Sequence, residues 1–401
     1  MNQMVFNQAA TLLNGLVAQM TGQANLTPIT TMSQFISVAE TLLQTGRDPV
    51  INALSQVWSR TIFAVREYNA KDGGLRMSLD RYGNAIRKLS PVAMPMVDDD
   101  GYKYPAAYDG AQVDPYGTGL SVDPWAIRKQ KTVQTNFYGS NVYANHFTTF
   151  KDQFDVAFSD AEEFVRYNAM NMTERRNDKE SFEESMAKGL QANFIAALID
   201  EANTDRVVHL LTEYNTLTGQ SLTAQTVMQG ANFEAFIRWM YSRIRTIVRR
   251  MGVRSEMYQT VLTGNTILRH TTPDNMRIAL STPIMEMINS MVLSNLYHDD
   301  YMRLPAYDSV EYWQSIETPD SVSCTPVYTD ASGNQKTGSA VAQASVVGVI
   351  HDRDAIGYAI TREDTNTTPL NPRGRYWNTF VSATFKTITD VTEKGVVLLL
   401  D

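Results

Sequence analysis

The stretch NPRGRYWN, from Asn371 to Asn378, decides how the rest of the chain is interpreted. Its proline fixes the chain direction, and Gly374 permits a tight backbone. Arg373, Tyr376 and Trp377 are residue types that protein interfaces favour as anchors. We therefore predict a subunit interface at Arg373, Gly374, Tyr376 and Trp377. Two alternatives stay open: an active-site loop, or aromatic side chains that fill the chain's own core beneath a long helix.

Strands are expected on both sides of this stretch. Residues 381–386 alternate between apolar and polar side chains, which is typical of a strand. The segment 396–400 is apolar on both faces, which predicts a fully buried strand. Upstream, residues 346–350 and 355–361 are predicted to pair as a hairpin across the turn HDRD at 351–354.

Farther upstream, the sequence predicts a long helix. Ser159 with Glu162 three residues later matches a capping box, and neither proline nor glycine follows until Gly189. Roughly thirty to forty helical residues would span about 45–60 Å, so we expect a strut. A second helix is expected from about Asn232, with an apolar stripe, and a third at about 283–297.

The first part of the chain has a different character. Residues 1–65 predict three short helical stretches that carry little charge and depend on tertiary contacts. Glycine, proline, aspartate and tyrosine crowd residues 66–125, which predicts a long, thin hairpin with candidate interface residues Tyr102 and Tyr104. Residues 126–150 then alternate in the manner of extended chain.

The composition excludes several classes of protein. The 401 residues carry a net charge of -8, so no overall basic field attracts nucleic acid. The single cysteine cannot form an intrachain disulfide, which suits a reducing compartment. The first basic residue is Arg47, so the N-terminus does not resemble a secretory signal, and no apolar run is long enough for a membrane span. These features favour a cytoplasmic protein.

No motif of catalytic chemistry is present in the sequence. The five histidines lie outside metal-ligand spacing of one another, and neither a phosphate loop nor a nucleophile elbow occurs. We therefore predict no catalytic, cofactor-binding or metal-binding residues. The carboxylates of DDDG at 98–101 and HDRD at 351–354 keep open a hydrolase with a long mobile lid. The arginines of 238–250 either complement a helix dipole or touch nucleic acid weakly.

The order of these elements resembles the major capsid proteins of tailed bacteriophages with the Hong Kong 97-type fold. NPRGRYWNTF at 371–380, followed by an alternating strand and an apolar terminus, is similar to the end of the phi-29-like podophage shell protein. NFYG at 136–139, shortly before the predicted long helix, fits the same pattern. The resemblance covers most of the chain by order of elements and these short stretches by residue.

The resemblance implies an α+β fold with four parts. These are an N-terminal helical arm at 1–65, an extended β-hairpin loop at 66–125, a peripheral domain with a spine helix at 126–205 and 365–401, and a mixed axial domain at 206–364. A decoration domain known from that kind of phage, and a scaffolding segment before the arm, are both absent from the expected layout. A separate scaffolding protein is therefore expected.

The implied function is self-assembly into pentamers and hexamers of an icosahedral or prolate phage head that encloses double-stranded DNA. The chain would not be an enzyme and would need no cofactor. Its implied partners are other copies of itself, a scaffolding protein, a portal protein at one vertex and, without sequence specificity, the packaged DNA, but no membrane. It would be assembled in the host cytoplasm and reside in the virion capsid. An encapsulin-like compartment is an alternative shell of the same fold.

Overall fold

The computed structural model describes residues 34, 37–38, 75–77, 85–94, 96, 127, 129–138, 141–152, 161–287 and 307–401. Several expectations lie outside these residues. They are the predicted helical arm apart from residues 34, 37 and 38, the candidate interface residues Tyr102 and Tyr104, and the Ser159 end of the capping box.

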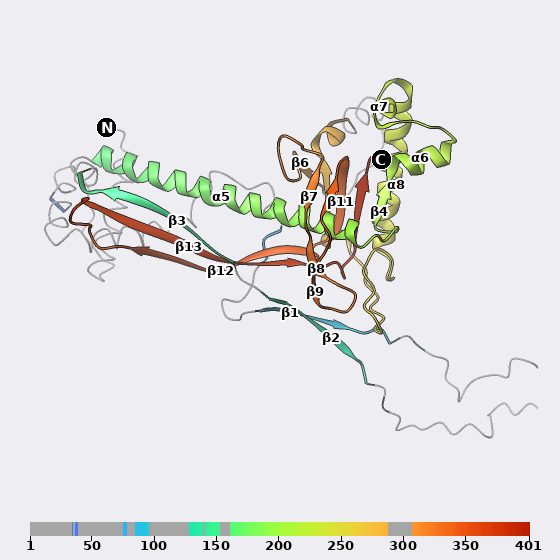
Figure 1. The fold of residues 1–401 in the computed structure, drawn as a ribbon, viewed down its shortest axis with the longest axis horizontal. Helices are drawn as coiled ribbons and strands as arrows, with labels where there is room; N and C mark the ends of the chain where they lie inside the picture. The colour runs from blue at the N-terminus through green and yellow to red at the C-terminus, as the bar shows by residue number, and fades with distance from the viewer. Residues whose placement is uncertain are drawn as a thin grey trace, which may run out of the picture.

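A five-stranded sheet forms the centre of the molecule, with the strand order β4–β14–β11–β5–β6 (Figure 1). The strands are β4 Val207–His209, β5 Met276–Ser281, β6 Tyr307–Val310, β11 Val346–Asp352 and β14 Gly395–Leu399. β11 is antiparallel to β14 and β5, whereas β4 runs parallel to β14 and β6 parallel to β5. Every residue of β11 and β14 is buried, which confirms the buried strand predicted near the end of the chain.

Helices cover both faces of this sheet, and each face has its own apolar core. α8 (Gly230–Met251) lies on one face together with α6 (Leu210–Thr218) and α7 (Ala224–Val227). The apolar stripe predicted for this helix is buried there against Ile278, Ile350 and Leu398 of the sheet. We call the sheet with these covering helices the central body.

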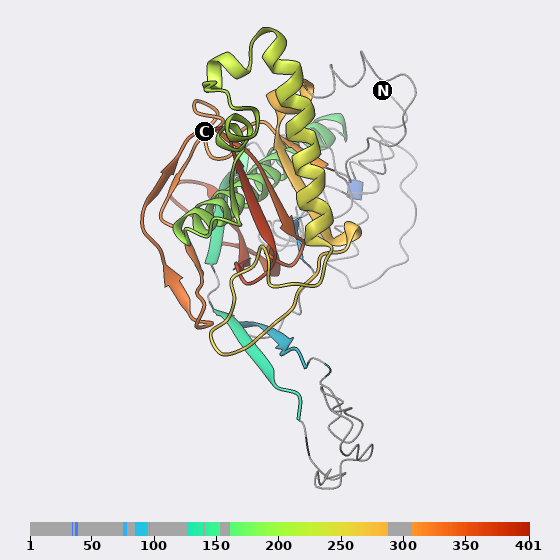
Figure 2. The ribbon, with the colours of Figure 1, turned by 90° about the vertical axis from the view of Figure 1, so that its right-hand side faces the viewer.

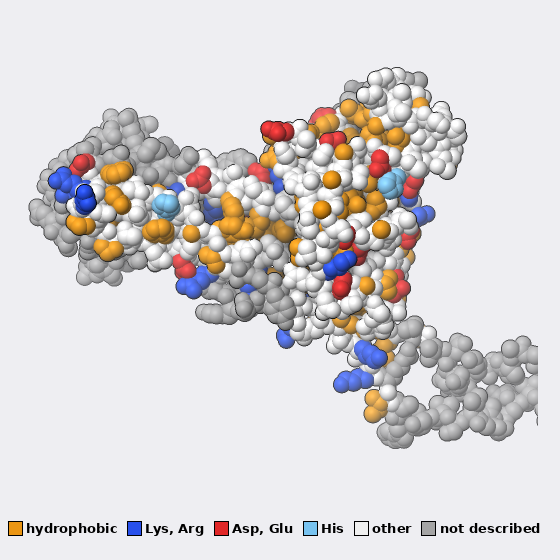
Figure 3. All heavy atoms as spheres, in the orientation of Figure 1, with side chains coloured by type: hydrophobic (Ala, Val, Ile, Leu, Met, Phe, Trp, Pro, Cys, Tyr) orange, Lys and Arg blue, Asp and Glu red, His pale blue; other side chains and the backbone are white. Residues whose placement is uncertain are grey.

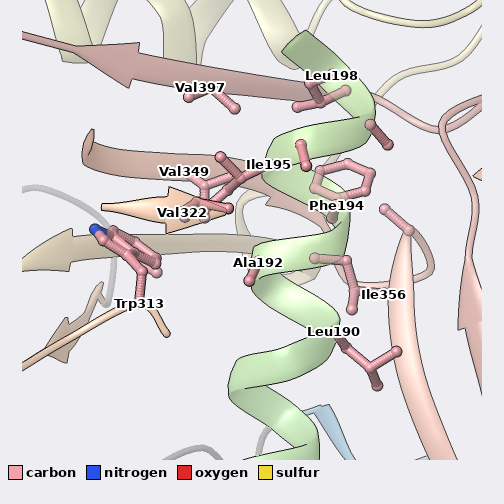
Figure 4. Packing of buried hydrophobic residues seen from close by; sticks show 14 of the residues in the cluster. Leu190, Ala192, Phe194, Ile195, Leu198, Trp313, Val322, Val349, Ile356 and Val397 are labelled. Carbon is pink, nitrogen blue, oxygen red and sulfur yellow. The ribbon is translucent and has the colours of Figure 1, made fainter. Parts of the chain in front are cut away.

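The other face of the sheet packs against the last turns of α5 (Ala161–Asp200). Figure 4 shows Ile195 directed toward Val349, with Leu198 close to Val397. On another side of the same helix, Leu190 and Phe194 lie toward Ile356 of the neighbouring strand β12 (Figure 4). The end of α5 is therefore buried between two sheets.

Beyond the central body, α5 extends along a three-stranded antiparallel sheet with the order β12–β13–β3 (Figure 1). Its strands are β3 Asn141–Phe150, β12 Ile356–Thr367 and β13 Tyr376–Thr389. The helix has 40 residues, as the sequence predicts, and at 1.5 Å per residue is about 60 Å long. We call this sheet, with the part of α5 that it accompanies, the wing.

The hairpin predicted for residues 346–361 is wrong. A turn at residues 353–355 does join β11 to β12, but β11 pairs with β5 and β14, whereas β12 pairs with β13. β11 is a 7-residue strand buried throughout, while β12 has 12 residues and is partly exposed in its second half. Both edges of β11 are occupied, by β5 and by β14, and β12 pairs along its whole length with the 14-residue β13, so the two strands lie in different sheets.

A separate two-stranded antiparallel sheet projects from the lower edge of the central body (Figures 1 and 2). It pairs β1 (Ala85–Pro91) with β2 (Thr132–Tyr138), and we call it the hairpin. β2 thus belongs with β1, although the sequence analysis groups residues from 126 onward with the peripheral domain.

The remaining elements are short. β7 (Val322–Cys324) pairs with β10 (Val341–Gln343), β8 (Val327–Thr329) pairs with β9 (Gln335–Thr337), and the 3-10 helix η3 spans Pro273–Asn275. Residues 282–287 begin the third predicted helix. Among the described helices, none is both long and apolar enough to cross a bilayer.

Candidate functional site

The NPRGRYWN stretch forms the turn between β12 and β13 at the outer end of the wing. Asn371 organises it: its Oδ1 accepts hydrogen bonds from the backbone N–H groups of Arg373 at 3.1 Å and Gly374 at 3.0 Å. Its Nδ2 donates to Tyr376 Oη at 3.1 Å. Arg375 has a positive φ of 52°, a left-handed conformation that costs a side-chain-bearing residue of order 1 kcal/mol. The turn is therefore a rigid, specified structure.

The predicted interface residues of this turn separate into exposed and buried ones. Arg373 and Gly374 are exposed, and Tyr376 is half-buried with its ring edge-on to Phe150 at 6.1 Å. Trp377 is fully buried and lies opposite Thr149 in the β13–β3 ladder. The core-filling alternative thus describes Trp377, whereas Arg373, Gly374 and Tyr376 remain available at the surface.

The edge strand of the wing exposes apolar side chains. Val142, Tyr143 and Phe150 of β3, and Phe380 of β13, are all exposed. β3 has no further strand beside it in the part of the chain that the structure describes. Unpaired strand edges with apolar side chains are ready to pair with another chain, so this edge is a candidate contact surface.

The hairpin has an inner and an outer face, set by the alternation that the sequence predicts for residues 132–138. Val133, Thr135 and Phe137 are buried or half-buried, while Thr132 and Gln134 are exposed. On the outer face Leu89 is 59% exposed. Figure 3 shows lysine, arginine and apolar side chains on the described part of the hairpin, without acidic ones.

An ionic cluster joins the hairpin to the central body. Lys88 Nζ of β1 donates to Asp390 Oδ2 at 2.5 Å and to Glu393 Oε1. Arg269 donates to the same Glu393 oxygen and, at 3.2 Å, to Ser90 Oγ of β1. We call Lys88, Arg269, Asp390 and Glu393 the joint cluster; two cations face two anions, so its charges balance.

Burial and pairing compete at the two carboxylates of the joint cluster. Burial favours the neutral acid of Asp390, but the charge of Lys88 and the hydroxyl of Thr392 outweigh it and hold the pKa of Asp390 below its usual value. At Glu393 the effect of burial is larger than the opposing effect of the charges on Lys88 and Arg269, so the pKa of Glu393 is raised. Both acids therefore depend on their cations to remain charged inside the protein.

The loop that carries these acids, residues 390–394, is also held by two buried cations. Arg206 donates to the backbone oxygens of Val391 at 2.9 Å and Gly395 at 3.1 Å, and burial lowers its pKa to about 10 despite Glu201. Lys394 Nζ donates to two backbone oxygens and to Ser255 Oγ, each at 3.1 Å, and burial lowers its pKa to about 8. The loop is therefore a hub of buried charged groups at the base of the central body.

This hub was not predicted from the sequence. A signal was present, because three charged residues, Asp390, Glu393 and Lys394, stand between the alternating strand at 381–386 and the strand at 396–400 that was predicted to be buried. Charges in such a place need partners, although nothing in the sequence says which distant residues supply them.

The motifs kept open for a hydrolase do not form a reaction site in the described residues. His351 of HDRD is buried, its Nδ1 lies 2.8 Å from the backbone oxygen of Asp352, and burial lowers its pKa to about 4. Asp352 accepts from Thr271 Oγ1 at 2.7 Å and from the backbone of its own turn. No group of three potential metal ligands occurs within the described ranges, and DDDG lies outside them.

A small groove lies where the hairpin meets the wing. About 220 Å³ in volume, it is bordered by β2, α5, β13 and the β8–β9 pair. Its lining is uncharged and amide-rich, with Asn136, Asn193 and Gln335 among the contributors. The lining of the groove holds no pair of groups suited to acid–base chemistry.

Comparisons with known proteins identify a family and solved structures that are similar to this chain. The family model described as "Phi29-like phage major capsid protein" matches residues 122–392. No curated protein matches the sequence. Among solved structures, the capsid of Staphylococcus phage Andhra is similar with a TM-score of 0.52 at 10% identity, covering 82% of this chain and 83% of that one. The mature capsid of bacteriophage PhiM1 is matched with a TM-score of 0.43 at 10% identity, over 84% and 88% of the two chains.

Proposed function

The chain belongs to the Phi29-like phage major capsid protein family, and on that premise we propose that it self-assembles into pentamers and hexamers of an icosahedral or prolate head around double-stranded DNA. As a major capsid protein it is a structural component of the phage virion. Its fold is proposed to be of the Hong Kong 97 type, with α5 as the spine helix.

The observation that carries the proposal is the hairpin. A two-stranded sheet is marginal in water unless it packs against something else. This one reaches the central body through the joint cluster and a few hydrogen bonds, such as Ala93 N–H to Thr266 O at 2.8 Å. Its outer face, with Leu89 exposed, has no cover within the described chain. A neighbouring copy is the partner that a shell supplies to every such hairpin.

The proposed division of the chain follows the same logic. Residues 1–65 serve as the arm, and 66–125 together with the return strand β2 serve as the extended loop. The rest of 126–205 with 365–401 forms the peripheral domain, and 206–364 forms the axial domain. Arg373, Gly374 and Tyr376 at the wing tip contact a neighbouring copy, while Trp377 holds the turn from inside. Tyr102 and Tyr104 of the loop are further proposed contacts.

The proposed partners beyond other copies are a scaffolding protein, a portal protein at one vertex and the packaged DNA, with assembly in the host cytoplasm. Neither alternative gains support. The hydrolase lacks an accessible acid–base pair at HDRD, because His351 is buried. The family match favours a phage head over an encapsulin-like compartment.

The test is assembly of the purified protein with a scaffolding protein, followed by electron microscopy. Closed particles, or rings with fivefold and sixfold symmetry, are expected. Sedimentation that shows only monomer at every concentration, salt and scaffold ratio contradicts the proposal.

Deleting residues 92–118 tests the part played by the hairpin. The central body should keep its fold by circular dichroism, because its two apolar cores lie outside the deletion, yet shells should no longer close. Normal closure of shells by this variant contradicts the assignment of the extended loop.

A further inference from the structure

We infer that neighbouring copies of this chain associate head to tail through two surfaces of opposite charge, an inference that rests on the proposed function. The cationic surface consists of Arg249, Arg250, Val253 and Arg254, at the end of α8 and directly after it. The acidic surface consists of Asp308, Ile316, Glu317 and Asp320, on β6 and in the loop that follows.

The cationic surface is the unpaired end of an arginine-rich helix. Nearer the start of α8, Arg238 contacts Glu234 at 2.6 Å and Arg243 contacts Glu213 at 2.6 Å. Arg249 and Arg250 in the last turn, and Arg254 after it, are exposed and make no ion pair with a described residue. The helix dipole favours cations there but leaves their guanidinium groups free for a partner.

The surrounding sequence has the same bias. Residues 245–272 contain five arginines and one acidic residue, Glu256. Val253, which lies beside Arg254, is 60% exposed. Arginine beside exposed apolar side chains is the composition that protein interfaces favour.

The segment that carries the acidic surface has the opposite charge bias to the cationic one. Residues 307–346 contain five acidic residues and one basic residue, Lys336. Asp308, Glu317 and Asp320 are exposed, and none makes an ion pair with a described residue. Ile316, next to Glu317, is 77% exposed. Each surface therefore combines unpaired charge of one sign with an uncovered aliphatic side chain.

The two surfaces lie on different sides of the central body and cannot meet within one copy. α8 is packed on one face of the five-stranded sheet, whereas the loop after β6 carries Trp313, which packs in the core on the α5 side. In Figure 1, α8 lies to the right and β6 to the left of the intervening strands. A surface that binds a different surface of the next copy gives a heterologous contact, and such contacts close into rings when the rotation permits.

The exposed apolar side chains favour a second copy over DNA as the occupant. Phosphate groups would need only the arginines, and contact with DNA would leave Val253 and the entire acidic surface without a role. A copy-to-copy contact uses both surfaces at once. Complementary charges then set orientation and association rate, while the aliphatic side chains are buried.

The experiment reverses the charge of each surface in a separate variant. One variant is Arg249→Glu/Arg250→Glu/Arg254→Glu, and the other is Asp308→Lys/Glu317→Lys/Asp320→Lys. Each alone should slow ring and shell formation by more than about tenfold, because like charges then face each other. Mixed together, the reversed surfaces complement each other, and assembly should return as rings with an even number of copies. Assembly is followed by light scattering and electron microscopy.

Arg238→Glu is the matched control, because it reverses an exposed arginine on the same helix outside the cationic surface, and it should assemble like the wild type. Circular dichroism verifies that each variant is folded. If wild-type protein does not assemble, the proposed function fails and this inference with it. If the wild type assembles and either triple variant matches its rate, or the mixture does not recover, the inference alone is overturned. Normal empty shells of the arginine variant that retain less duplex DNA would assign the cationic surface to DNA and also overturn it.

Discussion

The hairpin and the central body are built on opposite principles. The central body buries β11 and β14 completely, between α8 on one face and α5 on the other. The hairpin has two strands, an outer face with exposed Leu89, and an attachment that depends on the joint cluster. One region carries its own stability, and the other is complete only when something else covers it.

The difference shows how one chain can be both a stable subunit and an assembly component. Burial of apolar area gives the central body a stability that needs no partner. Charged groups fix the direction in which the hairpin projects, because salt bridges and hydrogen bonds are directional whereas apolar contacts are not. Elements with few apolar contacts open most easily, so under the proposed function we expect a neighbouring copy to reorient the hairpin more easily than the central body.

The largest effect is expected from opening a cavity in the central body. Phe194 is fully buried on α5 and contacts β14 so closely that a Cβ on Gly395 would lie 2.6 Å from its ring. Phe194→Ala should lower the free energy of unfolding of the unassembled protein by about 4 kcal/mol, measured by urea denaturation. Leu217→Ala on the exposed side of α6 is the control and should change it by less than about 0.5 kcal/mol. Equal effects of the two substitutions would contradict the conclusion that burial of apolar side chains stabilises the central body.

A smaller and more local effect is expected from the joint cluster. Lys88→Met leaves Asp390 and Glu393 buried with Arg269 as the one remaining cation of the cluster, which should cost about 3 kcal/mol. Hydrogen exchange should accelerate in β1 and β2 while β14 stays protected. Arg87→Met, on the adjacent exposed position of the same strand, should leave exchange unchanged. Uniform acceleration throughout the chain would show that the hairpin and the body open together.

The smallest effect concerns pH and the central body. Burial lowers the pKa of His351 from 6.5 to about 4, so the unfolded chain binds its proton first as the pH falls. Stability is therefore present above pH 6.5 and is lost as the pH falls toward 4, by about 2 kcal/mol between pH 7 and pH 5. His351→Gln should remove this part of the pH dependence in urea titrations of the unassembled protein. An identical pH profile for the two proteins would mean that His351 takes up protons in the folded state.

Much of the fold could be predicted from local patterns. The 40 residues of α5, the apolar stripe of α8, the alternation in β2 and the buried strand β14 are all visible in the sequence, because each reflects the period and burial of one element. The hairpin predicted across HDRD failed for the complementary reason. Two consecutive strands with a tight turn predict pairing, but both edges of β11 are occupied by the distant strands β5 and β14, and β12 pairs with β13.

Only part of the candidate site could be predicted from the sequence. The exposed turn at Arg373 and Gly374 follows from its proline, glycine and charged residues. The burial of Trp377 does not follow, because a tryptophan serves equally well as an interface anchor or as core. The joint cluster could not be predicted, since Lys88 and Asp390 are 302 positions apart in the chain.

The sequence by itself determined the long helix α5, the apolar stripe of α8, the alternation in β2 and the burial of β14. Only the tertiary structure decided which strand lies beside which, which charges neutralise each other inside the protein, and which charged surfaces remain without a partner. The physical reason is the distance along the chain over which each interaction acts. Backbone periodicity and hydrophobicity act within a few residues, whereas strand pairing and ion pairing depend on contacts between distant segments that exist only after the chain has folded.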